Sequence, residues 1–543
     1  MTTFWDELLA PERLAQELWE WTGERFERQR FDDVLQTARH VAAGLRRRGV
    51  GRGSVVPAVI TNMPDATAGY VGIWAAGAAI ASLPIPARGM SIDGYIRQLD
   101  ALCKRVGADF FLAEERFLQF MPDDAPISAE GVGYRALIET PERLEVEPPD
   151  PDDTVFVQFS SGTTGEPRGV QLSGRAMDAQ MRMLMERMQI DPARDVGYIW
   201  LPLSHDMGFF GCNLLAIYTG MRGIRSTPER FLMEPRSWFA DCAEMGVTVT
   251  AGPPSALQLA ARAERAAGGA GAPLKLRVCL VGAEPVHWEA LETAADALAP
   301  RGLSLDAFTV AYGLAETTLA VTMGDLAGPP HSVHVDGDAL ANGRIEEVAA
   351  DAPGARRILS TGTPVGATEI EVDPDTSEIV VRSPSVADGY LHQPEATAAR
   401  FRDGAVRTGD IGFVRDGELY VVGRSDDVLI VGGRNVYVHE VEAEMGSDPA
   451  IREGNCAIVE SHHDGRPRIG VLCELASARG NGQGGGDDAA DDRDAVADRL
   501  RTIALERAGL SVDEVVFLDP GAFPKTPSGK VQRFRCRALL SEA

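Results

Sequence analysis

Positive charge is scarce in this sequence. Its 543 residues contain 53 Lys and Arg against 80 Asp and Glu, so the formal net charge is −27. A nucleic-acid polyanion would be repelled by most of such a surface. DNA and RNA are therefore not expected as partners.

Cysteines and long hydrophobic runs are also few. The seven cysteines are odd in number and never spaced as Cys-x-x-Cys, which indicates neither a disulfide framework nor a zinc site. The uncharged stretch from Tyr70 to Leu83 is shorter than the ~20 residues of a membrane span and stops at Pro84. Met1 to Glu20 is acidic and lacks the basic start and apolar core of a signal peptide. We therefore expect a reduced, cytoplasmic protein without a membrane span.

The hydrophobic residues that are present alternate between helical and strand patterns. Helical periodicity runs from Phe31 to Arg48, and a strand with a turn is predicted over 55–62. Residues 70–83 are predicted to form a buried helix that passes into a buried strand. Strands and helices in alternation predict parallel α/β layers, and the length is ample for more than one core.

After Gly366 the pattern changes to short strands. Glu369–Val372, Glu378–Arg382 and Leu419–Val422 are separated by turn sequences and predict a small β-rich subdomain. Residues 477–494 consist largely of Gly, Asp and Ala, too polar to bury, and are expected to form a mobile surface loop.

One loop has the composition of a phosphate cradle. It follows a strand predicted over 154–159, and its glycines and hydroxyls bring N–H and O–H donors close to an anion. It is not a Walker loop, because no Lys-Ser or Lys-Thr pair follows Gly165 at the required spacing. A Ser/Thr/Gly surface loop is the alternative for this stretch taken alone. The candidate phosphate-binding residues are Ser160, Ser161, Gly162, Thr163, Thr164 and Gly165.

Further motifs follow this loop in a characteristic order. They are Trp200–Gly211, Gly282–Pro285, Ala311–Thr318, Arg407–Asp410, Gly423–Asp427 and Pro524–Lys530. Together with the loop, in which Arg168 stands where lysine is commoner, they resemble the adenylate-forming superfamily. That superfamily includes acyl-CoA and aryl-CoA synthetases, fatty acyl-AMP ligases, luciferases and nonribosomal adenylation domains.

The resemblance implies an α/β fold in two parts. Residues 1–425 would form a large adenylation domain of stacked α/β sheets with the small β-rich subdomain. Residues 426–543 would form a small, mobile α+β domain that carries the catalytic lysine, Lys530, which bridges the acid carboxylate and the α-phosphate. For Lys530 the alternative is an ordinary exposed basic turn.

The same resemblance implies roles for residues of the large domain. His205 would lie beside the carboxylate and the phosphates, although a lone histidine is more often structural. Glu316 would hold Mg²⁺, whose preferred ligands are carboxylate and phosphate oxygens, and Thr317 would donate to the α-phosphate. Gly282, Ala283, Glu284 and Tyr312 would form an adenine slot, in which a flat ring supports a flat base.

Ribose and hinge contacts are implied near the end of the large domain. Asp410 suits the two ribose hydroxyls, because a carboxylate accepts both hydrogen bonds. Arg424 would lie near the ribose, and Asp426 would be the hinge about which the C-terminal domain swings. A surface turn is the alternative for the hinge motif.

Apolar residues near these motifs suggest the substrate. Trp200, Met207, Phe209, Phe210 and Gly252 would wall a pocket for an apolar carboxylic acid, although such residues also form ordinary core. Such an acid would react with ATP and Mg²⁺ to give an acyl-adenylate and pyrophosphate.

The acceptor is left open between two thiols. The segment Val335–Leu359 resembles the insertion of fatty acyl-AMP ligases, which suppresses transfer to free coenzyme A and leaves a carrier-protein phosphopantetheine as acceptor. Gly432 and Gly433 instead resemble the pantetheine tunnel loop of acyl-CoA synthetases, because glycine leaves room for a thiol arm. A luciferase-type oxygenase and a catalytically silent binding protein are the alternatives of other classes.

Overall fold

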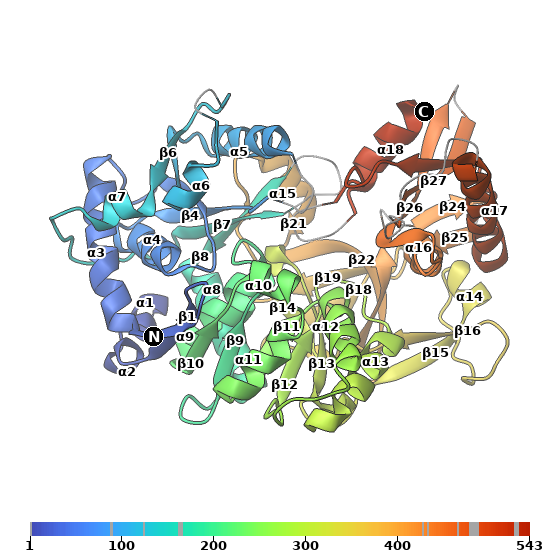
Figure 1. Cartoon of the computed structure of the whole chain (residues 1–543), viewed down its shortest axis with the longest axis horizontal. Coiled ribbons are helices and arrows are strands. Elements are labelled where there is room, and N and C mark those ends of the chain that lie inside the picture. Colours follow the sequence, from blue (N-terminus) through green and yellow to red (C-terminus); the bar gives the residue numbers. More distant parts are fainter. Residues whose placement is uncertain are drawn as a thin grey trace.

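The computed structural model describes most of the chain (Figure 1). The described residues are 3–86, 91–122, 125–160, 167–425, 428–431, 434–463, 466–476, 488–525 and 531–542. Within them no helix combines the length and the apolar composition needed to cross a membrane.

The first sheet has a parallel centre. In spatial order it consists of β20 (Gly389–Tyr390), β8 (Arg168–Ser173), β7 (Thr154–Ser160), β4 (Ala79–Leu83), β3 (Val55–Val59), β5 (Phe110–Ala113) and β6 (Glu130–Gly133). Pairing is parallel from β7 to β6, whereas β8 and β20 add antiparallel strands at one edge. The predicted strands over 55–62 and 154–159 are present.

Helices connect and cover this sheet. They are α3 (Phe31–Arg47), α4 (Pro64–Ala75), α5 (Ile92–Val106), α6 (Glu115–Leu118) and α7 (Tyr134–Ile138), preceded by α1 (Phe4–Leu8) and α2 (Pro11–Leu14). Helix α4 is apolar all round because α3, α7 and strands β3 and β4 enclose it. A Cβ on Gly72 would meet the Val41 side chain at 2.6 Å, so glycine permits the close approach of α3. The predicted helix over 31–48 and the buried helix and strand over 70–83 are confirmed.

The second sheet has its parallel strands in the middle. In order it consists of β17 (Thr363–Pro364), β14 (Ala320–Met323), β13 (Phe308–Gly313), β12 (Val278–Val281), β11 (Val249–Gly252), β9 (Val196–Ile199), β10 (Arg222–Arg225), β1 (Glu17–Trp21) and β2 (Phe26–Arg30). Pairing from β13 to β1 is parallel. The carboxyl ends of these strands therefore meet at one edge, which is where ligands bind in open α/β sheets.

The helices of this part lie between its strands in sequence. They are α8 (Gly174–Arg187), the π-helix η1 (Met207–Leu214), α9 (Leu215–Thr219), α10 (Pro228–Met233), α11 (Ser237–Met245), α12 (Pro254–Ala266), α13 (Trp288–Leu298) and the short 3₁₀ turns η2 (Ala299–Arg301), η3 (Leu305–Ala307) and η4 (Ala315–Thr317).

The predicted β-rich subdomain is present after Gly366. It consists of β18 (Glu369–Val372), β19 (Glu378–Arg382), β22 (Ala405–Arg415), β21 (Phe401–Arg402) and β23 (Glu418–Arg424), with α15 (Pro394–Arg400). Before it lies an antiparallel hairpin of β15 (Ser332–Asp336) and β16 (Ala355–Leu359), with α14 (Gly337–Ala341) between them.

The C-terminal elements gather beside the rest of the chain, at the upper right of Figure 1. They are β24 (Val428–Val431), β25 (Arg434–Tyr437), α16 (Val438–Met445), β26 (Ile451–His463), β27 (Arg466–Leu475), α17 (Asp488–Ala508), β28 (Glu514–Leu518) and α18 (Arg533–Glu542). Residues between Leu429 and Val512 form their own buried cluster. The boundary predicted at 425/426 stays a prediction.

One loop prediction is partly wrong. The loop expected over 477–494 is helical from Asp488 onward, because α17 begins there and buries Val496, Leu500 and Ala504 further along. The apolar residues after position 494 stabilise a helix whose polar first turns carry no hydrophobic signal of their own.

Candidate active site

A large cavity lies at the carboxyl ends of the parallel strands. Its volume is about 1280 Å³, and residues after β9, β11, β12 and β13 line it together with residues of the C-terminal elements. Strand order alone places these loops next to one another, because the four strands are neighbours and all end at this edge.

His205 lies on the cavity wall, directly before the π-helix. Its Nδ1 is 2.6 Å from Asp206 Oδ1, and the backbone N–H of Met207 donates to the same carboxylate oxygen. Gln158, at the end of β7, donates through Nε2 to the Ser204 carbonyl at 2.9 Å. The histidine is thus held between the strand that leads into the phosphate loop and the start of η1.

The residues expected to form an adenine slot lie at the ends of β12 and β13. Gly282, Ala283, Glu284 and Tyr312 all line the cavity. A Cβ on Gly282 would lie 2.7 Å from the Ala311 carbonyl oxygen, so only glycine fits between the two strands. Glu284 accepts hydrogen bonds from the Ser255 N–H and hydroxyl, at 3.2 and 3.0 Å.

Tyr312 connects this slot to Asp410. Its hydroxyl donates to Asp410 Oδ2 at 2.5 Å, and Arg424 Nε is 3.3 Å from Asp410 Oδ1. Burial, with Asp410 as the second cause, raises the pKa of Tyr312 well above its usual value, so the phenol stays a donor. Asp410 and Arg424 are cross-strand partners in β22 and β23, and the pairing holds the carboxylate on the cavity wall.

Glu316 lies in the turn after β13. The residue is 8% exposed and lines the cavity, and its Oε1 accepts from the Tyr390 hydroxyl at 2.8 Å. Among the described residues no group of three or more His, Cys, Asp or Glu could hold a metal unaided. A single hard carboxylate fits Mg²⁺, which is normally bound by one or two carboxylates together with substrate phosphates and water.

Thr317 does not face the cavity. Its side chain is fully buried, and its hydroxyl donates to the Leu314 carbonyl at 3.0 Å. The expected bond to an α-phosphate is therefore not supported by this arrangement. The tight 3₁₀ turn points Glu316 outward and Thr317 inward, a difference that the sequence motif did not show.

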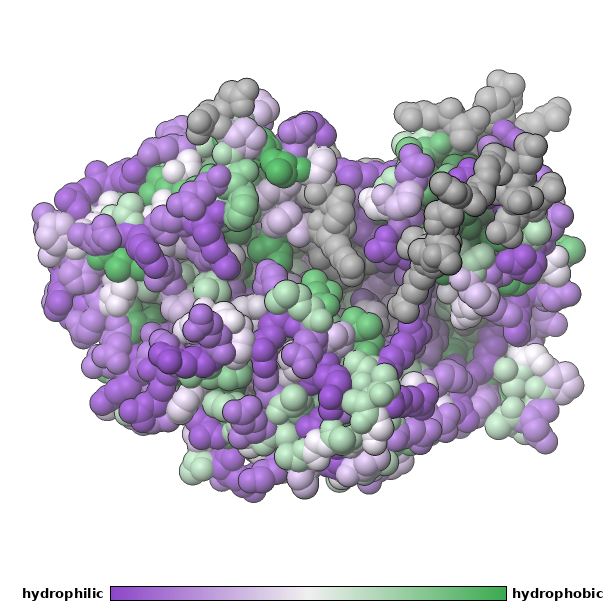
Figure 2. Space-filling model, in the orientation of Figure 1, coloured by the Kyte–Doolittle hydropathy of each residue, from purple (hydrophilic) through white to green (hydrophobic). Residues whose placement is uncertain are grey.

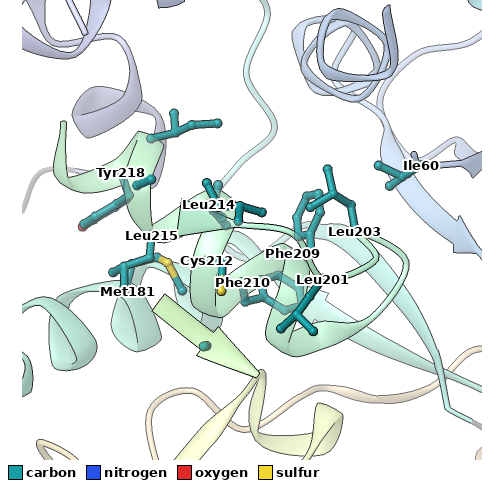
Figure 3. Close-up of a cluster of buried hydrophobic side chains, with 14 of the residues drawn as sticks. Ile60, Met181, Leu201, Leu203, Phe209, Phe210, Cys212, Leu214, Leu215 and Tyr218 are labelled. Carbon is teal, nitrogen blue, oxygen red and sulfur yellow. The ribbon is translucent and has the colours of Figure 1, made fainter. Parts of the chain in front are cut away.

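The aromatic residues expected to wall the acid pocket lie in the hydrophobic core. Phe209 and Phe210 have no exposed surface and belong to the buried cluster drawn in Figure 3. Each packs against Phe156, with ring centroids 4.5 and 5.0 Å away. Trp200 is also core, and its ring packs at a tilt against that of Phe231, with the centroids 4.1 Å apart. Gly252 faces the ring of Trp238. These four residues are absent from the lining of the cavity, whereas Met207 does line it.

An apolar arm of the cavity lies instead where α8 packs against β14. We use this name for the wall formed by Leu184, Met188, Gly211, Leu319, Ala320 and Met323. Sequence reasoning missed these residues because they come from separate elements. The one local signal was the methionine-rich stretch of 177–188, since methionines adapt to irregular apolar ligands.

Cations outnumber carboxylates on the described cavity wall, eight to six. The cations are Arg168, Arg262, Arg357, Arg400, Arg424, Lys525, Arg533 and Arg537. The face drawn in Figure 2 is largely hydrophilic, and the whole chain carries a net charge of −27. A locally positive wall in such a protein concentrates an anionic ligand at the cavity.

Lys525 brings the C-terminal motif to this wall. Burial lowers its pKa, and the negative charge of Glu284 opposes that shift.

Arg262 of α12 forms a two-point ion pair with Glu453 of β26, with N–O distances of 2.5 and 2.9 Å. Sequence reasoning did not identify this pair.

Several predicted residues lie outside the described part of the chain. They are Ser161, Gly162, Thr163, Thr164, Gly165, Asp426, Gly432, Gly433 and Lys530. The two ends of the phosphate loop are described: Ser160 of β7 pairs with Arg168 of β8, beside the cavity-lining Phe159. The roles predicted for the loop, hinge, tunnel and lysine stay predictions.

Known proteins resemble this chain in sequence and in structure. The AMP-binding enzyme family matches residues 11–391. A Mycobacterium tuberculosis protein, provisionally named fatty-acid–CoA ligase fadD25, is 32% identical over 418 residues, which are 72% of this chain and 70% of the relative. Medium-chain-fatty-acid–(acyl-carrier-protein) ligase TtuA of Teredinibacter turnerae is 30% identical over 72% of this chain and 64% of its own length.

Similarity to solved structures extends over the whole chain. A structure from a study of fatty acyl-adenylate ligases of E. coli and L. pneumophila superposes with a TM-score of 0.89 at 22% identity. The match covers 100% of this chain and 99% of the other, and it confirms the predicted α/β fold class.

Proposed function

Because the chain belongs to the AMP-binding enzyme family, we propose that it activates a fatty acid with ATP and passes the acyl group to a thiol. The first step gives an acyl-adenylate and pyrophosphate. The main supporting observation is that a single cavity is lined by polar residues, among them Asp410 and Glu316, and also by the apolar arm. Relatives named as ligases of fatty acids agree with this reading.

The chemistry of the first step is electrostatic. A fatty acid, with a carboxyl pKa near ~4.3, is ionised at neutral pH and needs no general base. Its oxygen attacks the α-phosphorus of ATP, a new O–P bond forms, and the bond to pyrophosphate breaks. Because two anions meet, the site must supply fixed donors and positive charge.

Residues of this chain fit those needs. Asp410 and Tyr312 would orient the nucleoside, His205 would lie beside the carboxylate, and the apolar arm would bind the hydrocarbon. Glu316 would hold Mg²⁺, which neutralises phosphate charge when bound. Lys530 and the loop 160–165 are proposed to complete the positive site, with Asp426 as the hinge of the C-terminal domain, residues 426–543.

We propose a carrier-protein phosphopantetheine as the thiol acceptor, with coenzyme A as the competing acceptor. Two observations support the carrier protein. TtuA is named for an acyl-carrier-protein substrate. In addition, α14 belongs to the segment that resembles the insertion of fatty acyl-AMP ligases, and it contacts β25 of the C-terminal elements.

The seven cysteines are all free and buried, which suits a reducing cytoplasm.

Pyrophosphate exchange tests the adenylation step. Fatty acids of graded length should drive exchange of labelled pyrophosphate into ATP. Asp410→Ala removes charged hydrogen bonds of about 1.5–3 kcal/mol, so we expect the KM for ATP to rise about 10- to 100-fold.

Asp448→Ala is the matched control, because Asp448 pairs with Arg499 away from the cavity lining. It should leave the KM for ATP unchanged. Failure of every fatty acid to drive exchange would refute the proposed reaction.

A further inference from the structure

Tyr390 makes a hydrogen bond that the predicted mechanism does not use. Its side chain is nearly buried, at 2% exposure, and its hydroxyl donates to Glu316 Oε1 at 2.8 Å. A phenol hydroxyl beside an ionised carboxylate is the donor of the pair, because the carboxylate can only accept. The Tyr390 hydroxyl therefore holds one oxygen of the Glu316 carboxylate.

The backbone around Tyr390 is fixed to both neighbouring motifs. Strand β20 pairs with β8, which begins directly after the phosphate loop. The Ala387 N–H donates to the Glu316 carbonyl at 2.9 Å, and the Thr318 hydroxyl donates to the Ser385 carbonyl at 2.8 Å. Tyr390 thus occupies the junction between the phosphate loop and the Glu316 turn.

Arg168 contacts the aromatic ring of Tyr390. Its guanidinium carbon lies 5.2 Å from the centroid of the Tyr390 ring, within the range of a cation–π interaction. A planar guanidinium stacks on an aromatic ring in a way that an ammonium does not. One ring therefore touches the first residue of β8, while its hydroxyl holds Glu316.

We propose that Tyr390 is a positioning residue, which fixes the Glu316 carboxylate for a divalent cation and ties it to the base of the phosphate loop through Arg168. This inference rests on the proposed function. A hydrogen bond from a neighbouring group orients a metal-binding carboxylate, and loss of such a bond typically weakens metal affinity 10- to 100-fold. A merely structural tyrosine would not influence the metal selectively.

Metal binding itself provides the test. Mn²⁺, which is visible by electron paramagnetic resonance, is titrated into full-length protein saturated with α,β-methylene-ATP, which cannot be cleaved at the α–β bond. In Tyr390→Phe the Mn²⁺ dissociation constant should rise about 10- to 100-fold, while affinity for AMP without metal stays unchanged.

Tyr218→Phe is a closely matched control. Tyr218 is equally buried, at 1% exposure, and its hydroxyl donates to Asp178 at 2.7 Å, but neither residue lines the cavity. It should lose the same kind of hydrogen bond without altering Mn²⁺ affinity. Unchanged Mn²⁺ affinity in Tyr390→Phe, or a parallel loss of AMP and Mn²⁺ binding, would overturn the proposal.

Glu316→Gln, alone and combined with Tyr390→Phe, tests whether the tyrosine acts on the metal through the Glu316 carboxylate. If Tyr390 acts through the carboxylate, Tyr390→Phe should add little to the loss of Mn²⁺ affinity already caused by Glu316→Gln. Additive losses would show that the tyrosine acts independently of Glu316 and would contradict the inference. Wild-type protein that binds no α,β-methylene-ATP at all would refute the proposed function instead.

Discussion

Gly211 sets the width of the apolar arm. A Cβ at this position would meet Leu319 Cδ2 at 2.9 Å, and that atom is the far end of a flexible side chain. Alanine is therefore tolerated after a small shift of Leu319, whereas leucine would occupy space that a hydrocarbon chain needs. The residue lies in η1, so its substitution changes the arm without touching the polar groups of the cavity.

We expect Gly211→Leu to shift the preference toward shorter acids. If it displaces three methylenes, at about 0.8 kcal/mol each, kcat/KM for long acids falls about 50-fold. Gly211→Ala serves as the control and should retain the wild-type profile. Equal losses of kcat/KM for short and long acids would argue against the assignment of this arm.

The sequence predicted the positions of some site residues better than those of others. His205, Tyr312, Glu316 and Asp410 were predicted from motifs, and the structure brings all four to one cavity. Motif order was informative for His205, Tyr312 and Glu316, because they lie at or after the carboxyl ends of β9 and β13, which meet at one edge of the sheet. Asp410 reaches the same cavity from within β22. Thr317, by contrast, is buried and bonded to the Leu314 carbonyl, because adjacent residues of a tight turn face opposite ways.

At the scale of elements, the π-helix η1 explains why Phe209 and Phe210 lie away from the cavity. Its hydrogen bonds join residues five apart, so its faces do not follow the 3.6-residue period used to read a helix. Phe209 and Phe210 therefore join the core, while Met207 and Gly211 reach the cavity. By contrast α3 and β7, whose patterns are regular, were predicted almost to the residue.

The hairpin of β15 and β16 is the element that bears on the acceptor. Asp336 and Ala355 are directly paired, so residues 337–354, which include α14, can be replaced by an Asn-Gly turn without changing the strand register. This removes the contact between α14 and β25. It also removes buried Leu340 from a small cluster with Val335 and Ile358, so some loss of stability is expected.

We expect wild-type protein with ATP, a fatty acid and free coenzyme A to accumulate acyl-adenylate with little acyl-CoA. The shortened hairpin should form more acyl-CoA, because the C-terminal domain is less restrained. Mass spectrometry of the products measures both species, and Leu340→Ala controls for lost packing. Abundant acyl-CoA from the wild type would contradict the proposal that this hairpin suppresses transfer to free coenzyme A.

At the scale of the whole molecule, an exposed ion pair links α12 to the C-terminal elements. Arg262 and Glu453 join α12 to β26 by two N–O contacts, but their side chains are 62% and 54% exposed. Exposed ion pairs contribute at most about 1 kcal/mol and are screened by salt. This ion pair can therefore favour the observed orientation of the C-terminal elements by a small free energy, but it cannot exclude other orientations.

Reversing the charge of one partner should change the population of this orientation. In Arg262→Glu two carboxylates face each other, and we expect the ratio of this arrangement to any other to fall up to about fivefold, which corresponds to about 1 kcal/mol. The double variant Arg262→Glu/Glu453→Arg restores opposite charges and should recover the wild-type ratio. The difference between single and double variants should shrink as ionic strength rises.

Spin labels can measure this distribution of distances. Burial raises the pKa of all seven native thiols, so labels would react selectively with cysteines introduced at exposed Glu292 of α13 and Glu506 of α17. Double electron–electron resonance then compares wild type, single and double variants. A distance distribution that is the same in all three at low salt would show that the Arg262–Glu453 pair has no part in setting the orientation, and that packing around the cavity sets it instead.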